Sequence, residues 1–195
     1  MKIVNYQLKN RPSCNRIGFM QNNQVYDLQE SYRMYTLAHG QLEELKDIES
    51  LLPTDPTTFF KGGFPTIERA KQAYEYITEN EQEVVFAYDR EEVVIGTPIP
   101  EPQKVICIGR NYKEHAAEMK GDIPEFPVLF SKFPNALIGP EDEIHKSDQT
   151  KKLDYEVELA LVIGKEATKV SQEEAFDYIA GYTIGNDTTA RDIQK

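Results

Sequence analysis

Alternating acidic residues occupy the segment Leu153–Gly164, which has the pattern of a β-strand. Side chains alternate between the two faces of a strand, so Asp154, Glu156 and Glu158 share one face, which continues with small or apolar residues. Two carboxylates about 7 Å apart on one face repel each other unless a cation compensates them. A bound divalent ion would do so. A solvated edge strand whose acids face water is the alternative, and the pattern leaves both open.

A second polar group follows a predicted strand at Ile179–Gly185. Asp187 then lies at the end of this strand, where active-site groups often collect, although a helix N-cap is the ordinary role for an aspartate here. The segment Thr188–Lys195 is predicted to start a helix. Arg191 and Gln194 would share one face of that helix, and both can bind a carboxylate or carbonyl group.

A third candidate pair, His115 and Glu118, lies in the segment Asn111–Met119, which is predicted to be a short helix or an ordered loop. If the segment is helical, the two side chains are one turn apart and can hydrogen-bond. A carboxylate that orients an imidazole makes a general base, acting directly or through water. A neighbouring surface pair is the alternative. His39 and His145 are interpreted as ordinary polar residues.

The first half of the chain is predicted to be a small α/β module, residues 1–96, without catalytic character. Hydrophobic alternation and turn residues predict strands there, and apolar spacing of three and four predicts helices. The predicted strands are Ile3–Leu8, Arg16–Met20, Val25–Leu28 after a turn at Asn22-Asn23, Val84–Ala87 and Val93–Ile95, and the predicted helices are 41–52 and 66–80.

A Pro-rich linker, residues 97–103, is predicted before the second part, residues 104–195. Three prolines at alternate positions in Thr97–Pro102 disfavour both a helix and a central strand. Beyond the linker, apolar runs predict strands, and the pattern Ser171–Glu174 predicts a helix N-terminus. The expected elements are strands Lys104–Ile108, Val128–Phe130 and Asp154–Ile163, and a helix from the Ser171 cap through Tyr178.

Composition narrows the functional class. The formal net charge of −11 argues against a surface for nucleic acid or anionic lipid. No run approaches the roughly 20 apolar residues of a membrane helix, and the N-terminus lacks the apolar core of a signal peptide. The two cysteines, Cys14 and Cys107, are far apart, so a disulfide framework or structural zinc site is not expected. A cytoplasmic protein with free thiols is the expectation, with Cys107 a small core residue.

Three segments together resemble successive motifs of the fumarylacetoacetate hydrolase family, the 2-hydroxyhepta-2,4-diene-1,7-dioate isomerase type in particular. They are KVICIGRNYKEHAAEM, LDYEVELALVIGK and GYTIGNDTTARDIQ, in the family's order over about residues 100–195. The resemblance implies that Glu156, Glu158 and Asp187 bind Mg²⁺ or Mn²⁺, with Ca²⁺ also accepted, and that His115 and Glu118 form an acid–base pair on a mobile lid. It also matches Arg110, Tyr112, Arg191 and Gln194 to positions that contact substrate.

This resemblance implies a mixed α/β, β-rich fold: the small N-terminal module followed by the first half of a β-roll catalytic domain. It implies hydrolysis, isomerisation or decarboxylation of a small 2-oxo dicarboxylic acid, and a homodimer. A 2-hydroxyhepta-2,4-diene-1,7-dioate isomerase or fumarylacetoacetate hydrolase type is the first expectation, and an oxaloacetate or acylpyruvate activity the second. A non-catalytic scaffold that keeps the metal site is the alternative. Family members continue through a substrate-binding lysine that would fall after Lys195, so little activity is expected from these 195 residues alone.

Overall fold

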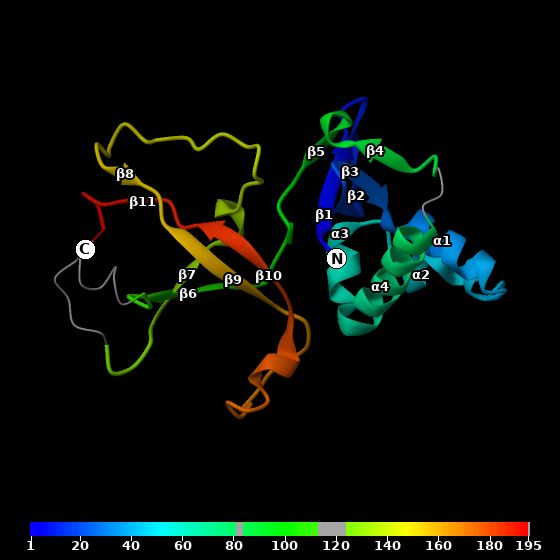
Figure 1. The fold of residues 1–195 in the computed structure, drawn as a ribbon. Helices are drawn as coiled ribbons and strands as arrows, with labels where there is room; N and C mark the ends of the chain where they lie inside the picture. Colours follow the sequence, from blue (N-terminus) through cyan, green and yellow to red (C-terminus); the bar gives the residue numbers. More distant parts are fainter. Residues whose placement is uncertain (81–83, 113–123, 195) are drawn as a thin grey trace.

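The computed structural model describes residues 1–80, 84–112 and 124–194. Figure 1 shows two groups of elements side by side, an α/β half that contains the N-terminus and a second half built from β-strands. The segment after β5 crosses from one half to the other. Residues 96–104 form neither helix nor strand, as their prolines predict. Among the described helices, none combines the length and the apolar character that crossing a bilayer requires.

The first half contains one antiparallel sheet in the order β4-β3-β2-β1-β5. Asn22 and Asn23 both adopt positive φ, of 49° and 63°, and form the predicted two-residue turn between β2 and β3. The strands are β1 (Ile3–Leu8), β2 (Arg11–Gln21), β3 (Gln24–Asp27), β4 (Ala87–Asp89) and β5 (Val93–Ile95).

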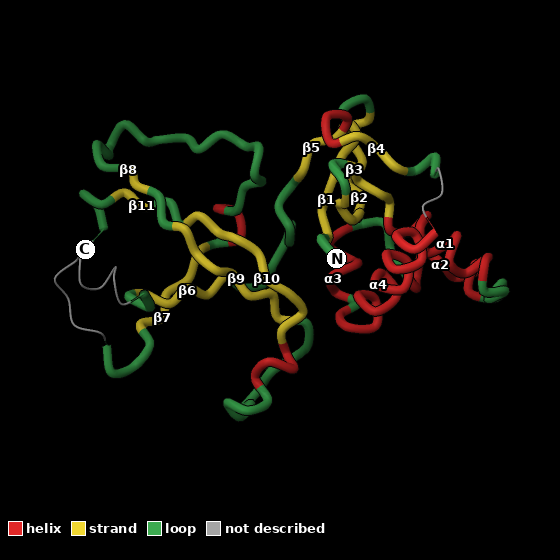
Figure 2. The backbone as a smooth tube through the Cα atoms, viewed as in Figure 1, coloured by secondary structure: helices red, strands yellow, loops and turns green. Residues whose placement is uncertain are grey.

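Helices cover one face of this sheet (Figure 2), and the larger core lies between the two layers. Phe19 of the sheet stacks on Tyr26 at a ring-centroid distance of 4.9 Å and meets Tyr74 of a helix edge-on at 5.1 Å. These buried aromatic contacts join the layers. The helices are α1 (Leu28–Ala38), α2 (Ile48–Leu51), α3 (Pro56–Lys61) and α4 (Gly63–Asn80).

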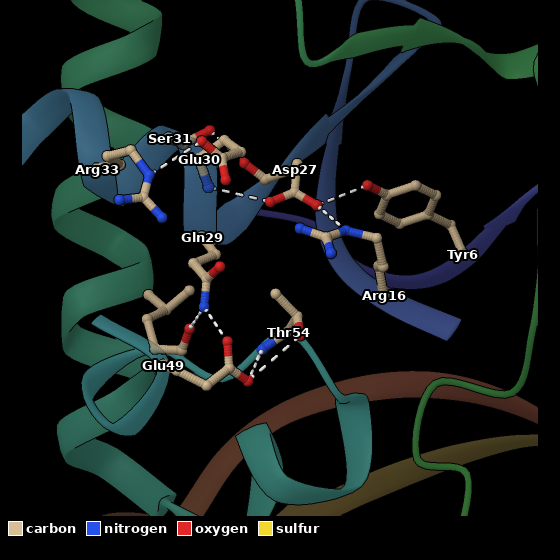
Figure 3. A network of polar contacts seen from close by, with 10 residues as sticks. Tyr6, Arg16, Asp27, Gln29, Glu30, Ser31, Arg33, Glu49 and Thr54 are labelled. Carbon is tan, nitrogen blue, oxygen red and sulfur yellow. Dashed lines mark hydrogen bonds and ion pairs between the residues drawn. The ribbon is translucent and has the colours of Figure 1, made fainter. Parts of the chain in front are cut away.

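A buried carboxylate, Asp27, ties the sheet to the first helix (Figure 3). Its Oδ2 accepts hydrogen bonds from the Tyr6 hydroxyl at 2.7 Å and from Arg16 Nε at 2.6 Å, while its Oδ1 caps α1 by accepting from Glu30 N at 3.0 Å. Burial, followed by the negative charge of Asp27, raises the pKa of the Tyr6 phenol. These partners come from the sheet and the first helix, so this network stabilises the fold.

The second half consists of three antiparallel strand pairs. β6 pairs with β7, β9 pairs with β10 over most of their length, and the short β8 pairs with β11. The bounds are β6 (Val105–Gly109), β7 (Val128–Lys132), β8 (Leu153–Asp154), β9 (Val157–Ile163), β10 (Ile179–Asn186) and β11 (Thr189–Ala190).

Several predicted elements have different bounds or types. Leu28 begins α1 instead of extending a strand, and α1 and α3 were not predicted. The helix predicted at 41–52 is a 3₁₀ turn, Glu44–Asp47, followed by the single turn α2. The Ser171 cap forms, with Glu174 N donating to Ser171 Oγ at 3.3 Å, but it opens only a 3₁₀ helix, Ala175–Tyr178. The chain has the mixed α/β, β-rich class that the sequence predicts.

Two corrections concern the candidate site itself. The strand predicted over Asp154–Ile163 is interrupted at residues 155–156, because the chain leaves β8 before it enters β9. The helix predicted from Thr188 is wrong: Thr189-Ala190 form β11, which pairs with β8, and one turn follows. In that turn Gln194 N donates to Ala190 O at 2.9 Å. Pairing with β8 outweighs the local helical preference.

Candidate metal and substrate site

The acidic face of β9 is the protected one. Glu158 is half-buried, as are the residues that follow it on the same face, whereas Leu159 and Leu161 on the opposite face are 58% and 50% exposed. The alternation therefore confirms that the apolar residues near Glu158 share its side of the strand. A solvated edge strand would show the reverse, with its acids outward, so this arrangement favours a function for the acids.

Glu156 is held by its backbone in the break between β8 and β9. Its N–H donates to Asn186 Oδ1 at 3.1 Å, and its carbonyl oxygen accepts from Asp187 N at 2.8 Å. Both backbone groups of Glu156 are therefore satisfied by the end of β10. The interruption of the strand brings Glu156 and Asp187 together from positions 31 residues apart in the sequence.

The side chain of Asp187 is 10% exposed, less than those of Glu156 at 19% and Asp154 at 46%. Its carboxylate forms an ion pair with Lys132 at the end of β7. Its buried Oδ1 has no correctly directed hydrogen bond to any described residue. An oxygen whose only compensation is one flexible ammonium group is suited to a further cation.

Arg191 lies between two acids on the other side of Glu156. Its Nε donates to Asp154 Oδ2 at 3.0 Å, and its Nη1 forms an ion pair with Glu156 Oε1. Nη1 also donates to Gln194 Oε1 at 3.2 Å, so the predicted proximity of Arg191 and Gln194 is found although the helix is not. Burial lowers the pKa of Arg191, but the bond to Asp154 and the charge of Glu156 outweigh it and raise the pKa.

Cys107 on β6 lies near the acids and is half-buried, not an enclosed core residue. Burial first, and then the negative charge of Asp187, raises the pKa of its thiol, with a smaller contribution from Glu158 and an opposing one from Lys132. The charges that act on Cys107 place Asp187, Glu158 and Lys132 around the same strand. A raised pKa disfavours the thiolate form of Cys107.

The other predicted substrate residues lie at the end of β6. Arg110 is exposed and adopts a positive φ of 56°, unusual for a side-chain-bearing residue. The Tyr112 hydroxyl accepts a hydrogen bond from Leu159 N at 3.3 Å, directly after Glu158. This bond brings Tyr112 onto the strand that carries the acids. His115 and Glu118 lie outside the described residues.

An open pocket of about 350 Å³ adjoins the acids. Lys132 and Asp187 line it on one side, and Thr188, Thr189 and Gln194 contribute hydroxyl and amide groups. A pocket with a few polar groups and apolar walls is typical of small-molecule sites. Phe130, Ala190 and Ile193 provide the apolar part. The pocket is large enough for a small organic acid.

The residues present fit a hard divalent ion in their chemistry. Glu156, Glu158 and Asp187 offer only carboxylate oxygens, which suit Mg²⁺, Mn²⁺ or Ca²⁺ over Zn²⁺. In the part of the chain that the structure describes, however, three such side chains do not converge as closely as metal coordination requires. Glu156 is paired with Arg191 and Asp187 with Lys132. To bind one ion together, these side chains would have to turn away from their present cationic partners.

Three residues that contribute to this geometry were not among the predicted site residues. Lys132 pairs with Asp187, Asn186 holds the backbone of Glu156, and Asp154 orients Arg191. Asn186 and Asp154 adjoin predicted residues, so proximity in sequence was an available signal. Lys132 lies 55 positions before Asp187, and only the packing of β7 beside the end of β10 brings them together.

Known proteins resemble this chain over all or part of its length. The fumarylacetoacetate (FAA) hydrolase C-terminal profile matches residues 104–195. The oxaloacetate tautomerase YisK of Bacillus subtilis is 39% identical over 200 residues, covering 100% of this chain and 62% of that protein.

Two solved structures share the fold. The fumarylacetoacetate hydrolase of Exiguobacterium antarcticum superposes with a TM-score of 0.61 at 27% identity, covering 100% of this chain and 58% of that one. The maleylpyruvate hydrolase of Sphingobium sp. SYK-6, in complex with manganese(II) ion and pyruvate, has a TM-score of 0.64 at 21% identity, covering 98% and 60%. The chain thus spans about three fifths of the length of each of these proteins. Residues 104–195 belong to the fumarylacetoacetate hydrolase family.

Proposed function

We propose that the protein is a divalent-metal-dependent enzyme that acts on a small, enolisable 2-oxo dicarboxylic acid. The observation that carries this proposal is the 2.8 Å backbone hydrogen bond that joins Glu156 to Asp187 beside the strand that carries Glu158. Family membership supports an enzyme over a scaffold. Mg²⁺ or Mn²⁺ is the proposed cofactor, and a manganese-containing structure of the same fold supports it.

Among reactions, keto–enol tautomerisation of oxaloacetate is the first candidate, because a relative that matches the whole chain is named an oxaloacetate tautomerase. Isomerisation or hydrolysis of the 2-hydroxyhepta-2,4-diene-1,7-dioate or fumarylacetoacetate type is the second, supported by the Exiguobacterium hydrolase. Both reactions pass through an enolate next to a 2-oxo group, so one site chemistry serves both.

Each residue has a proposed role in that chemistry. A bound divalent ion would supply positive charge that stabilises the enolate. Glu156, Glu158 and Asp187 would hold that ion. Arg191, kept in place by Asp154 and Gln194, would orient substrate oxygens.

The proton would move through His115, with Glu118 orienting the imidazole. In tautomerisation, His115 takes the proton from the carbon beside the 2-oxo group, and the oxygen receives a proton from solvent or from the same residue. Arg110 and Tyr112 would line the entrance to the site. A homodimer of this enzyme remains a prediction.

The test is a rate measurement on the purified full-length protein after EDTA treatment. Enol loss from oxaloacetate is followed by ultraviolet absorbance, and pyruvate release is followed separately, each with Mg²⁺, with Mn²⁺ and without metal. We expect metal-dependent turnover that Glu158→Gln abolishes and that Glu166→Gln, an exposed acid beyond β9, leaves unchanged. Metal binding without turnover of any 2-oxo acid would instead support the scaffold alternative.

A further inference from the structure

Lys132 and the proposed metal ligand Asp187 both line the pocket. Its ammonium forms an ion pair with Asp187, and its side chain is 34% exposed whereas that of Asp187 is 10% exposed. Among the described residues, Lys132 has one further contact, a distant one of 5.9 Å from Nζ to the centre of the Phe130 ring. The ammonium therefore depends mainly on Asp187 among the described residues.

Arg191 differs from Lys132 in this respect. Its guanidinium is also bonded to Asp154 and Gln194, so it retains partners if Glu156 turns toward a metal ion. Planar guanidinium groups with several fixed bonds keep their position, whereas a lysine on a four-carbon stem reorients readily. Lys132 is the cation that metal binding would move.

Metal binding would weaken the Lys132–Asp187 pair. A divalent ion bound by Asp187 would lie within a few ångströms of the ammonium, and like charges at that distance repel each other. The oxygen that faces the ammonium, Asp187 Oδ1, is also the one that lacks a directed hydrogen bond from any described residue. Lys132 thus compensates Asp187 most strongly while no metal is bound.

The ammonium of Lys132 can turn from Asp187 into the pocket. Among the described residues that line the pocket, Lys132 is the only positively charged one, and Thr188, Thr189 and Gln194 add hydroxyl and amide groups. A carboxylate in this pocket would meet donors on both sides. A lysine acts as a point charge for such a group.

We propose that Lys132 changes partner in the catalytic cycle: it neutralises Asp187 in the metal-free protein and, when metal binds, turns to the carboxylate of the 2-oxo acid. This inference rests on the proposed function. It makes Lys132 a substrate-binding residue and orders the events, since the pocket becomes ready for an anion only after the metal has released the ammonium.

The test uses two titrations on the same set of proteins. Mn²⁺ affinity is measured from the electron paramagnetic resonance signal of free Mn²⁺, and pyruvate affinity is measured calorimetrically at saturating Mn²⁺. The variants are Lys132→Met, Lys132→Gln as a second neutral side chain, and Lys132→Arg, which keeps the charge. Lys46→Met is the matched control, because Lys46 forms a lysine–acid pair with Glu43 at 2.6 Å in the other half of the chain.

The expected result is a pair of opposite changes. In Lys132→Met and Lys132→Gln, Mn²⁺ should bind about tenfold more tightly and pyruvate about tenfold more weakly, as removal of one nearby charge predicts. Lys132→Arg and Lys46→Met should stay within about threefold of wild type for Mn²⁺. Circular dichroism and thermal unfolding verify that each variant is folded.

Other outcomes would overturn the inference. A lysine that only supports Asp187 would, when removed, weaken both ligands together, and one without a role would change neither. Tighter Mn²⁺ binding with unchanged pyruvate binding in Lys132→Met would show that Lys132 does not turn to the carboxylate of the 2-oxo acid. If the wild-type protein binds Mn²⁺ and Lys132→Met binds it equally, only this inference fails; if neither binds Mn²⁺, the proposed function fails as well.

Discussion

The backbone N–H of Asp187 donates to the carbonyl oxygen of Glu156 at 2.8 Å, and this bond joins two acids that are distant in sequence. The neighbouring Asn186 completes the arrangement by accepting from Glu156 N. Together these two bonds replace the strand pairing that is missing where the chain leaves β8. The site depends on an interruption of a strand, and the interruption is stabilised by the residue next to a proposed metal ligand.

Asn186→Ala should therefore weaken the site without removing any ligand. Loss of the side-chain acceptor leaves Glu156 N without its partner, which costs about 1 kcal/mol of unfolding free energy. We expect Mn²⁺ affinity to fall about tenfold because Glu156 loses its fixed position. Asn186→Asp keeps an acceptor oxygen and serves as the control for the backbone bond. Equal Mn²⁺ affinity in Asn186→Ala and wild type would show that the clamp is unimportant.

Arg191→Lys tests the fork that joins Asp154, Glu156 and Gln194. Lysine keeps the charge but cannot make these three contacts at once. We expect kcat/KM for oxaloacetate to fall about tenfold or more. The measurement is initial rate against substrate concentration at saturating Mn²⁺. Rates equal to wild type would leave Arg191 with a purely structural role.

His115→Ala addresses the proposed acid–base pair. We expect kcat to fall by about 10²–10⁴-fold, the usual contribution of a general base, with Mn²⁺ affinity nearly unchanged. His145→Ala is the matched control, because His145 is an exposed histidine of the same half. If turnover survives in His115→Ala, the acid–base role is wrong and His115 and Glu118 are a neighbouring surface pair.

Asp27 should be the most sensitive polar residue of the first half. Asp27→Ala leaves the Tyr6 hydroxyl and Arg16 without their shared acceptor and removes the cap of α1, so we expect a loss of about 3 kcal/mol in the free energy of unfolding. Tyr6→Phe should cost about 1–2 kcal/mol. Tyr26→Phe should cost less, because the Tyr26 hydroxyl donates to Gln24, a residue that is only partly buried. Urea denaturation measures all three.

Asp55 gives a prediction about pH. Hydrogen bonds from the Thr58 side chain at 2.6 Å and backbone at 2.8 Å lower the pKa of this N-cap carboxyl. A carboxyl whose pKa is lower in the folded protein stabilises it above the unfolded pKa, about 3.9, and this contribution is lost as pH falls through the folded value.

Asp55→Asn keeps the cap but cannot titrate. The difference in unfolding free energy between wild type and Asp55→Asn, measured by urea denaturation, should therefore shrink between about pH 5 and pH 2. Asp55→Ala should cost about 1 kcal/mol at neutral pH. A difference that stays constant with pH would mean that the folded pKa of Asp55 is not lowered.

Much of the local structure follows from the sequence because its causes are local. The Asn22-Asn23 turn needs residues that tolerate positive φ, and the alternation after Glu158 needs only the two-residue period of a strand. Asp55 and Pro56 are also a helix start that sequence reading could have found. The first helix was missed because Leu28 was interpreted as the last residue of the strand that begins at Val25.

The sequence by itself determined which chemistry the second half offers: acids at alternating positions, an aspartate at a strand end, and an arginine three residues from a glutamine. The tertiary structure decided how these groups meet. Pairing of β11 with β8 replaced the expected helix, and the break before β9 allowed the carbonyl oxygen of Glu156 to accept a hydrogen bond from Asp187 N. It also brought Lys132 to the same carboxylate. These outcomes depend on contacts between distant segments, whose free energies exceed the local preferences that a sequence pattern expresses.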